Sequence, residues 1–258
     1  MSPSTVLLTC FCLIMIGGAP ALPATETAEE PMTLQDVLAE YFAAQGGIEH
    51  LETVNSLRMI GTLTIGDREM EIIQIKKRPN LMRMTVKTEN GDLIQGFNGN
   101  TAWRTLRQRE QAIELEGRER EELIRNAYLF SQIYQPDDNN VTLSYLGMQE
   151  VRGEPAHTVV VELDDGSKMT HYIDPETYLD NLIISETMVD GVPIIIESVY
   201  SNIQTVKEMQ LPYKVENFMD GELQSSIELE TIEINPGIHS PYFDPPGGIE
   251  PKGQTDTP

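Results

Sequence analysis

Cysteine is almost absent from this chain of 258 residues. Its two cysteines, Cys10 and Cys12, both lie in an apolar stretch near the N-terminus. We expect that stretch to be removed as part of a signal peptide, which would leave no disulfide, no thiolate nucleophile and no cysteine ligand for a metal. The stability of the remaining domain must then come from a hydrophobic core, for which the chain is long enough.

Basic residues are also scarce. The chain has 18 Lys and Arg residues against 41 Asp and Glu residues, which gives a formal net charge of −23 at neutral pH. A field of this sign repels phosphate backbones and anionic lipid surfaces, so nucleic-acid binding is not expected. We attribute the charge to solubility rather than to one basic partner.

Long apolar runs are missing. No run approaches the roughly 18 residues that a membrane-spanning helix requires, so an integral membrane protein is not expected. The longest run, Val6 to Ile16, is followed by small residues at Ala19 and Ala21. These occupy positions −3 and −1 of a cleavage site after Ala21, which is the pattern of a secretory signal. We therefore predict a signal peptide over residues 1–21 and export of the mature chain.

A lipoprotein signal is the alternative interpretation of the same segment. Acylation would have to occur at Cys10 or Cys12, but the bulky Leu8 stands where a small residue is usual before an acylated cysteine. That site would also come too early to leave a full apolar core in the signal. Cleavage after Ala21 is favoured.

The rest of the chain divides into a flexible leader over residues 22–31, one domain over residues 32–246 and a Pro/Gly-rich disordered tail over residues 247–258. Thr33 and Asp36 predict the start of an amphipathic helix that ends at Gly46 and Gly47. A second helix is predicted over residues 117–130.

Apolar residues elsewhere alternate with polar ones, and Asn-Gly and Asp-Gly pairs separate the alternating segments, as in β-hairpins. The predicted strands cover residues 56–65, 69–76, 82–87, 93–97, 101–107, 141–146, 156–163, 168–173, 181–189, 192–200, 213–219 and 222–234. This order predicts a mainly β (α+β) fold with a single curved antiparallel sheet, whose concave face is covered by the helices.

Catalytic and metal-binding motifs are not found. The sequence has no HExxH, GxSxG, P-loop or GxGxxG pattern, so no metal, no cofactor and no catalytic residue is predicted. His157 and His171 lie on neighbouring predicted strands and could form a two-histidine site, although two unrelated strand residues are the favoured interpretation. A carboxylate-dependent hydrolase remains an alternative, because a pair of carboxylates needs no local motif.

Methionine is frequent on the predicted strands. On the sequence alone these residues are best interpreted as core, but a flexible thioether also suits irregular apolar ligands, so a pocket is the alternative. Trp103, the only tryptophan, has the same two interpretations.

Several segments resemble the outer-membrane lipoprotein-sorting proteins of the LolA/LolB-like superfamily. They are AAQGGIEHLETVNSLRMIGTL (43–63), KKRPNLMRM (76–84), FNGNTAW (97–103), VRGEPAHTVVVEL (151–163), HYIDPETYL (171–179), LPYKVENFMDG (211–221) and INPGIHSPYFDPP (234–246). The resemblance implies an incomplete β-barrel of about eleven strands, lidded by helices around an apolar cavity. It also implies the function of such carriers, which enclose the acyl chains of lipoproteins and carry them across the periplasm.

The hypothesis is therefore a soluble periplasmic carrier that encloses lipoprotein acyl chains or a related lipid, without covalent chemistry, and that meets donor and acceptor proteins of the envelope. The alternative from another class is a β-scaffold that binds or senses a protein partner. The candidates for a lid-locking arginine are Arg58, Arg83 and Arg104. The residues expected to line the cavity are Leu57, Met59, Leu63, Met82, Met84, Trp103, Leu123 and Phe130.

Overall fold

The computed structural model describes residues 32–105, 111–134, 141–189 and 192–250. The predicted signal peptide and leader (residues 1–31), and residues 251–258 of the predicted tail, lie outside the described residues.

A single antiparallel sheet contains all the strands of the described residues. Its order is β6-β5-β4-β3-β2-β1-β13-β12-β11-β10-β9-β8-β7, so β6 and β7 form its two edges. The strands are β1 Ser56–Ile65, β2 Arg68–Lys77, β3 Leu81–Val86, β4 Leu93–Phe97, β5 Ala102–Thr105, β6 Ala112–Glu114, β7 Thr142–Val151, β8 Glu154–Glu162, β9 Lys168–Ile173, β10 Asp180–Val189, β11 Val192–Val206, β12 Met209–Met219 and β13 Glu222–Ile234.

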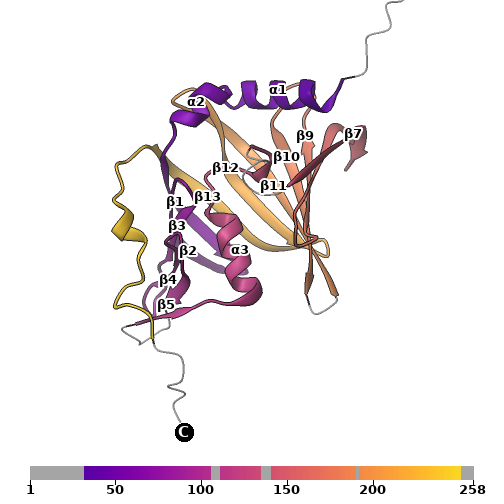
Figure 1. Cartoon of the computed structure of the whole chain (residues 1–258). Helices are drawn as coiled ribbons and strands as arrows, with labels where there is room; N and C mark the ends of the chain where they lie inside the picture. The colour runs from indigo at the N-terminus through magenta and orange to yellow at the C-terminus, as the bar shows by residue number, and fades with distance from the viewer. Residues whose placement is uncertain (1–31, 106–110, 135–140, 190–191, 251–258) are drawn as a thin grey trace, which may run out of the picture. The chain divides into compact units, whose positions relative to one another are not determined.

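The predicted class is confirmed, since the protein is mainly β with one open, curved sheet and helices on its concave side (Figure 1). The strand count differs: the sheet has 13 strands rather than about eleven. One of them, β6, has only 3 residues and was not predicted, because a strand that short contains too little alternation to be recognised.

The first and the last strand of the sheet pair with each other in its middle. Leu57 of β1 lies opposite Ile234 of β13, and the register shifts between Ile60 and Gly61. At this shift a Cβ on Gly61 would lie 2.1 Å from the carbonyl oxygen of Glu228, so only glycine allows the two backbones to approach so closely. This seam divides the sheet into a first wing, β1 to β6, and a second wing, β7 to β13.

Three α-helices cover the concave side and one rim of the sheet (Figure 1). Helix α1 (Leu34–Ala44) has the predicted start: the Thr33 hydroxyl accepts from the Asp36 backbone N–H, and Asp36 accepts from the Thr33 N–H. Helix α2 (Ile48–Thr53) was not predicted, because six residues carry little periodic signal. Helix α3 (Gly117–Ala127) ends before Tyr128, so Phe130 lies outside the helix to which the sequence assigned it.

The C-terminal segment covers the outer face of the first wing, and Figure 1 shows it alongside β1 to β5. Its 3-10 turn, η2 (Ser240–Phe243), buries Phe243 completely against Ile75 and Leu81. Beyond this turn, the backbone of residues 248 and 250 hydrogen-bonds to Ala112 of β6, within the stretch predicted to be a tail. This pairing protects the β6 edge from other strands.

Candidate functional site

A cavity of about 450 Å³ lies between the concave face of the sheet and the elements above it. Pockets that enclose small ligands have volumes of about 300–1,000 Å³, so this cavity is large enough for one. Its floor comes from β1, β2 and β9 to β13, and its roof from α1 and from residues 125–132.

The floor of the cavity is mainly apolar, and part of the roof is apolar too. The apolar lining residues are Leu57, Met59, Leu129, Phe130, Met169, Leu179, Ile183, Ile203, Leu211, Pro212, Val215, Ile227, Leu229 and Ile232. The polar lining residues are divided between the roof and the floor strands opposite it. This mixture suits a ligand with a long apolar part and one polar group.

The roof is held together by aromatic contacts. The ring of Tyr134 packs edge-on against Phe42 of α1, with 5.3 Å between centroids, and lies 5.4 Å from the ring of Phe130. The Tyr134 hydroxyl also donates to the carbonyl of Ile48 in α2. These contacts join both N-terminal helices to the segment that follows α3.

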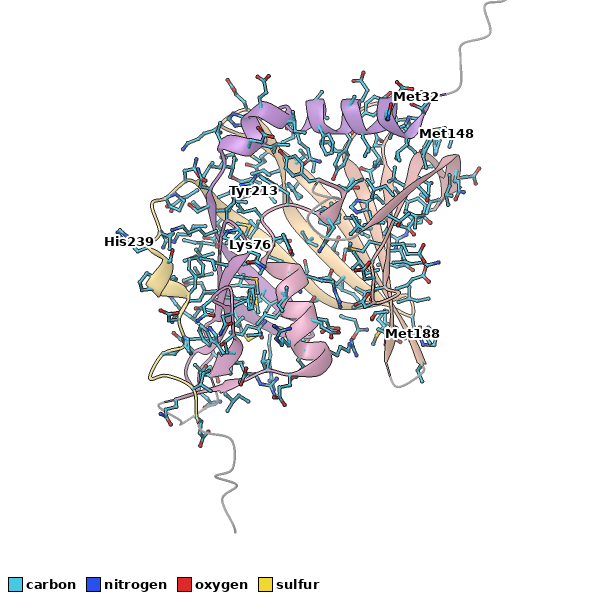
Figure 2. The ribbon with its side chains drawn as sticks, viewed as in Figure 1. Met32, Lys76, Met148, Met188, Tyr213 and His239 are labelled. Atoms are coloured by element: carbon cyan, nitrogen blue, oxygen red, sulfur yellow. The ribbon has the colours of Figure 1, made fainter. Side chains whose placement is uncertain are left out.

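Lys76 reaches the roof from β2 (Figure 2). Its Nζ donates to the backbone carbonyl of Tyr128 at 3.0 Å, and the side chain lines the cavity. Burial lowers the pKa of Lys76 to about 8, because the charged form loses its hydration. In the described part of the chain no carboxylate forms an ion pair with it, whereas Arg125 in the same lining pairs with Asp165 at 2.8 Å.

A chain of hydrogen bonds connects α1, the strands and the roof. The Tyr41 hydroxyl donates to Oδ2 of Asp180 at 2.7 Å, and Oδ1 of Asp180 lies 2.9 Å from Nδ1 of His171. Nε2 of His171 lies 3.2 Å from the hydroxyl of Ser131. Burial, followed by the charge of Asp180, raises the pKa of Tyr41 well above its usual range, and the same two causes raise that of Tyr200 to about 12.

Asp180 is the one carboxylate among the described residues that line the cavity. A glycosidase-type hydrolase needs two carboxylates that face one cleft. The described lining therefore does not provide the pair that such chemistry requires.

The structure brings three of the eight predicted lining residues to the cavity, namely Leu57, Met59 and Phe130. The others lie elsewhere. Met82 packs in one cluster with Leu123 of α3, so both belong to the core beneath that helix. Leu63 and Met84 belong to a separate cluster formed by strands β1, β2, β3 and β13.

Trp103 lies on the opposite face of the sheet. Its neighbour Ala102 packs in the cluster beneath α3, and successive residues of a strand point to opposite faces. The Trp103 indole is fully buried under the C-terminal segment, where Nε1 donates to the carbonyl of Phe243 at 2.9 Å.

The two histidines on neighbouring strands have separate partners. His157 shares a 2.7 Å hydrogen bond with the Tyr145 hydroxyl and stacks on the ring of Tyr178 at 5.6 Å, whereas His171 belongs to the network of Asp180. Within the described ranges, no group of three or more His, Cys, Asp or Glu side chains is arranged to hold a metal ion.

The three arginine candidates differ in their contacts. Arg58 pairs with Glu233 of the adjacent strand, and Arg83 donates to the carbonyl of Tyr242 beneath the C-terminal segment. Arg104 pairs with Glu119 of α3. Lys76, which the sequence analysis did not single out, instead contacts the roof backbone inside the cavity. On one face of β2 Lys76 follows Met70, Ile72 and Gln74, so the sequence carried only a weak signal for it.

Among the residues described, no helix is both long and apolar enough to cross a membrane.

The fold is found in solved structures. A LolA superfamily protein from Nitrosomonas europaea superposes with a TM-score of 0.57 at 12% sequence identity, covering 82% of this chain and 97% of that one. The fold is that of the LolA superfamily.

Two further structures share this LolA-like fold. A proposed outer membrane lipoprotein-sorting protein domain from Vibrio parahaemolyticus matches with a TM-score of 0.54 at 9% identity, over 81% of this chain and 94% of that one. A DUF1329 family protein from Desulfovibrio piger matches with a TM-score of 0.51 at 11% identity, over 81% and 97%. No family model and no curated protein matches the sequence. At these identities the similarity establishes the LolA-like fold, and function has to be argued from the cavity.

Proposed function

We propose that this protein is exported to the periplasm, loses residues 1–21, and carries acyl chains of lipoproteins or of a related lipid in its cavity. The observation that carries the proposal is the mainly apolar floor beneath a roof of α1 and residues 125–132, in a volume of about 450 Å³. Each CH₂ group of an acyl chain costs about 0.8 kcal/mol to expose to water, so a carrier must enclose the chain. Carriage requires no covalent step, and the LolA-like fold is consistent with it.

The contact of Lys76 with the roof leads us to expect an acidic group on the ligand. Lys76 is held at the cavity wall by one neutral carbonyl, that of Tyr128, and has no carboxylate partner in the described part of the chain. An ammonium group removed from water is stabilised by a nearby anion. We therefore expect a fatty acid, or a lipid with an acidic group beside its acyl chain, to bind better than the corresponding alcohol.

A fluorescent fatty acid, dansyl-undecanoic acid, tests this function in solution. The Met59→Gln variant places an amide in the apolar floor, where a bound acyl chain offers it no hydrogen bond, and should weaken binding about tenfold. Met188→Gln is the matched control, because Met188 is 63% exposed and lies at the end of the sheet away from Lys76 (Figure 2). Its affinity should equal that of the wild type.

Two outcomes would contradict the proposal. One is the absence of saturable binding to the wild-type protein. The other is an equal loss of affinity in Met59→Gln and Met188→Gln, which would place the probe on the surface. Replacing Lys76 by methionine should remove the preference for the acid over the alcohol while binding of the alcohol persists.

A further inference from the structure

A serine, a histidine and an aspartate meet at the cavity. Ser131 follows α3, His171 lies on β9 and Asp180 begins β10. The Ser131 hydroxyl is 3.2 Å from Nε2 of His171, and Nδ1 of the same ring is 2.9 Å from Oδ1 of Asp180. Both ring nitrogens are thus occupied, one by a nucleophile and the other by a carboxylate.

The chemistry of the partners assigns the protons. An ionised carboxylate only accepts hydrogen bonds, so Nδ1 of His171 donates to Asp180. Nε2 of the neutral ring is then left to accept from the Ser131 hydroxyl. Asp180 also accepts from Tyr41 on its other oxygen at 2.7 Å, which fixes the carboxylate from two directions. This is the arrangement in which a histidine takes the proton of a serine nucleophile.

The position of the three residues gives the nucleophile access to a ligand. Ser131 and Asp180 both line the cavity, while His171 is fully buried behind them. Burial shields the hydrogen bonds of the imidazole from water, and Ser131 remains at the cavity surface. The apolar floor on the opposite side is suited to an acyl chain whose ester group would reach the roof.

We propose that Ser131, His171 and Asp180 form a catalytic site that cleaves acyl esters held in the cavity. Ser131 Oγ attacks the ester carbonyl carbon as its proton passes to Nε2 of His171. The bond to the alcohol oxygen breaks, and the alcohol leaves with that proton, so the acyl group stays on Ser131. Water then gives its proton to His171 and attacks the acyl-serine, which releases the carboxylic acid and restores the Ser131 hydroxyl. An ester and one water molecule thus yield an acid and an alcohol.

The site also has a donor for the negative oxygen that forms during attack. The backbone N–H of Gln132 follows the nucleophile directly and begins the 3-10 turn η1 (Gln132–Tyr134). A backbone N–H next to the nucleophile is a common donor to such an oxygen. A structural function alone, as a cap on η1, would use the Ser131 oxygen as an acceptor from Ile133, at 3.4 Å, but would not require His171 and Asp180 behind it.

A long-chain alkyl fluorophosphonate reports directly on an activated serine, because it forms a stable bond to the oxygen that attacks it. The full-length mature protein is incubated with the probe, and peptide mass spectrometry then locates the adduct. The account predicts one adduct, on Ser131, together with hydrolysis of p-nitrophenyl decanoate. The Ser131→Ala variant should lose both, and His171→Gln should react at least about 100-fold more slowly.

Ser167→Ala is the matched control. Ser167 is a buried serine whose hydroxyl meets Thr187 rather than a histidine, and it does not line the cavity. This variant should react as the wild type does. Circular dichroism of each variant shows whether it has folded, and labelling of the wild type is informative even if a variant does not fold.

Asp180 acts through His171. Its test therefore needs a measurement that a loss of structure alone would not change. In Asp180→Asn the kcat for p-nitrophenyl decanoate should fall much more than its KM rises, because the ester still binds in the cavity while His171 is no longer held with Nε2 toward Ser131.

The proposal is overturned if folded wild-type protein carries no adduct on Ser131, or if unfolded protein labels Ser131 equally fast. It is also overturned if His171→Gln reacts at the wild-type rate. These results do not depend on the carrier function, because binding of dansyl-undecanoic acid to the wild-type protein is measured separately.

Discussion

Lys76 donates to the backbone carbonyl of Tyr128 at 3.0 Å, and this contact joins a strand of the floor directly to the roof of the cavity. Since the partner is neutral, the ammonium gains a hydrogen bond but no opposite charge. The apolar residues Leu57, Leu129 and Phe130 lie in the same lining. The wall therefore holds a cation whose charge the described protein does not neutralise there.

The pH dependence of stability should reveal this lysine. Its pKa in the folded protein is lowered from 10.5 to about 8, so between these values the unfolded state holds more protons than the folded one. The free energy of unfolding of the wild type should therefore rise with pH across this window, relative to Lys76→Met. Below pH 8 both states carry the proton and the cost of burying it is fully present.

The size of the effect follows from the shift. Each pKa unit corresponds to about 1.4 kcal/mol, and contact with cavity water reduces the total to about 1–3 kcal/mol. Urea unfolding of wild type and Lys76→Met at about pH 7 and about pH 10 measures the difference. A difference between the two proteins that stays constant with pH would show that Lys76 is not buried as a cation.

The fluorescence of Trp103 should not respond when a ligand fills the cavity. Trp103 is the only tryptophan, and it lies on the outer face of the sheet under Phe243. Its fluorescence should not change on addition of an unlabelled fatty acid, and Trp103→Phe should leave affinity unchanged. The same variant leaves the buried Phe243 carbonyl without its donor, which should lower the free energy of unfolding by about 1–3 kcal/mol. A ligand-dependent shift of the emission would place the tryptophan at the cavity instead.

Gly61 should be essential for the joining of the first and last strands. In Gly61→Ala the new methyl group would lie 2.1 Å from the Glu228 oxygen and 2.7 Å from Cα of Leu229, and both are backbone atoms that cannot move aside alone. We expect a loss of at least about 3 kcal/mol, or failure to fold. Thr62→Ala, one residue along the same strand, is the control and should cost less than about 1 kcal/mol. Equal stability of the two variants would mean that the backbones of β1 and β13 do not approach each other at Gly61 as closely as described.

Much of the local structure could be predicted from the sequence. The helix that begins after Thr33 has both bonds of its capping box, and the alternation of apolar residues with Asp-Gly turns located most of the strands. These features depend on neighbours within about four residues, which is the range that propensity and periodicity describe.

The cavity lining could be predicted only in part, because it depends on what covers each face. The alternation of β1 placed Leu57 and Met59 on one face, but only the position of α3 decides that Met82 is covered while Met59 lines the cavity. Trp103 is buried on the outer face of the sheet because a segment 140 residues later in the chain covers it. Long-range packing of this kind leaves no local signal.

The Ser131, His171 and Asp180 cluster had no motif that a search could recognise. Ser131 and His171 are separated by 40 residues, and His171 and Asp180 by 9, on adjacent strands. Such clusters are identified by geometry rather than by spacing. The sequence suggested a pairing of His171 with His157, but the partner of His157 is Tyr145.

Native mass spectrometry of the protein, purified without detergent from its own host, tests the proposed carrier function most directly. The account predicts a mass increment that gentle collision releases as an acyl lipid, present on wild type and on Met188→Gln and reduced on Met59→Gln. Protein that is bare after purification, and stays bare after exposure to vesicles made from the host's own lipids, would contradict it.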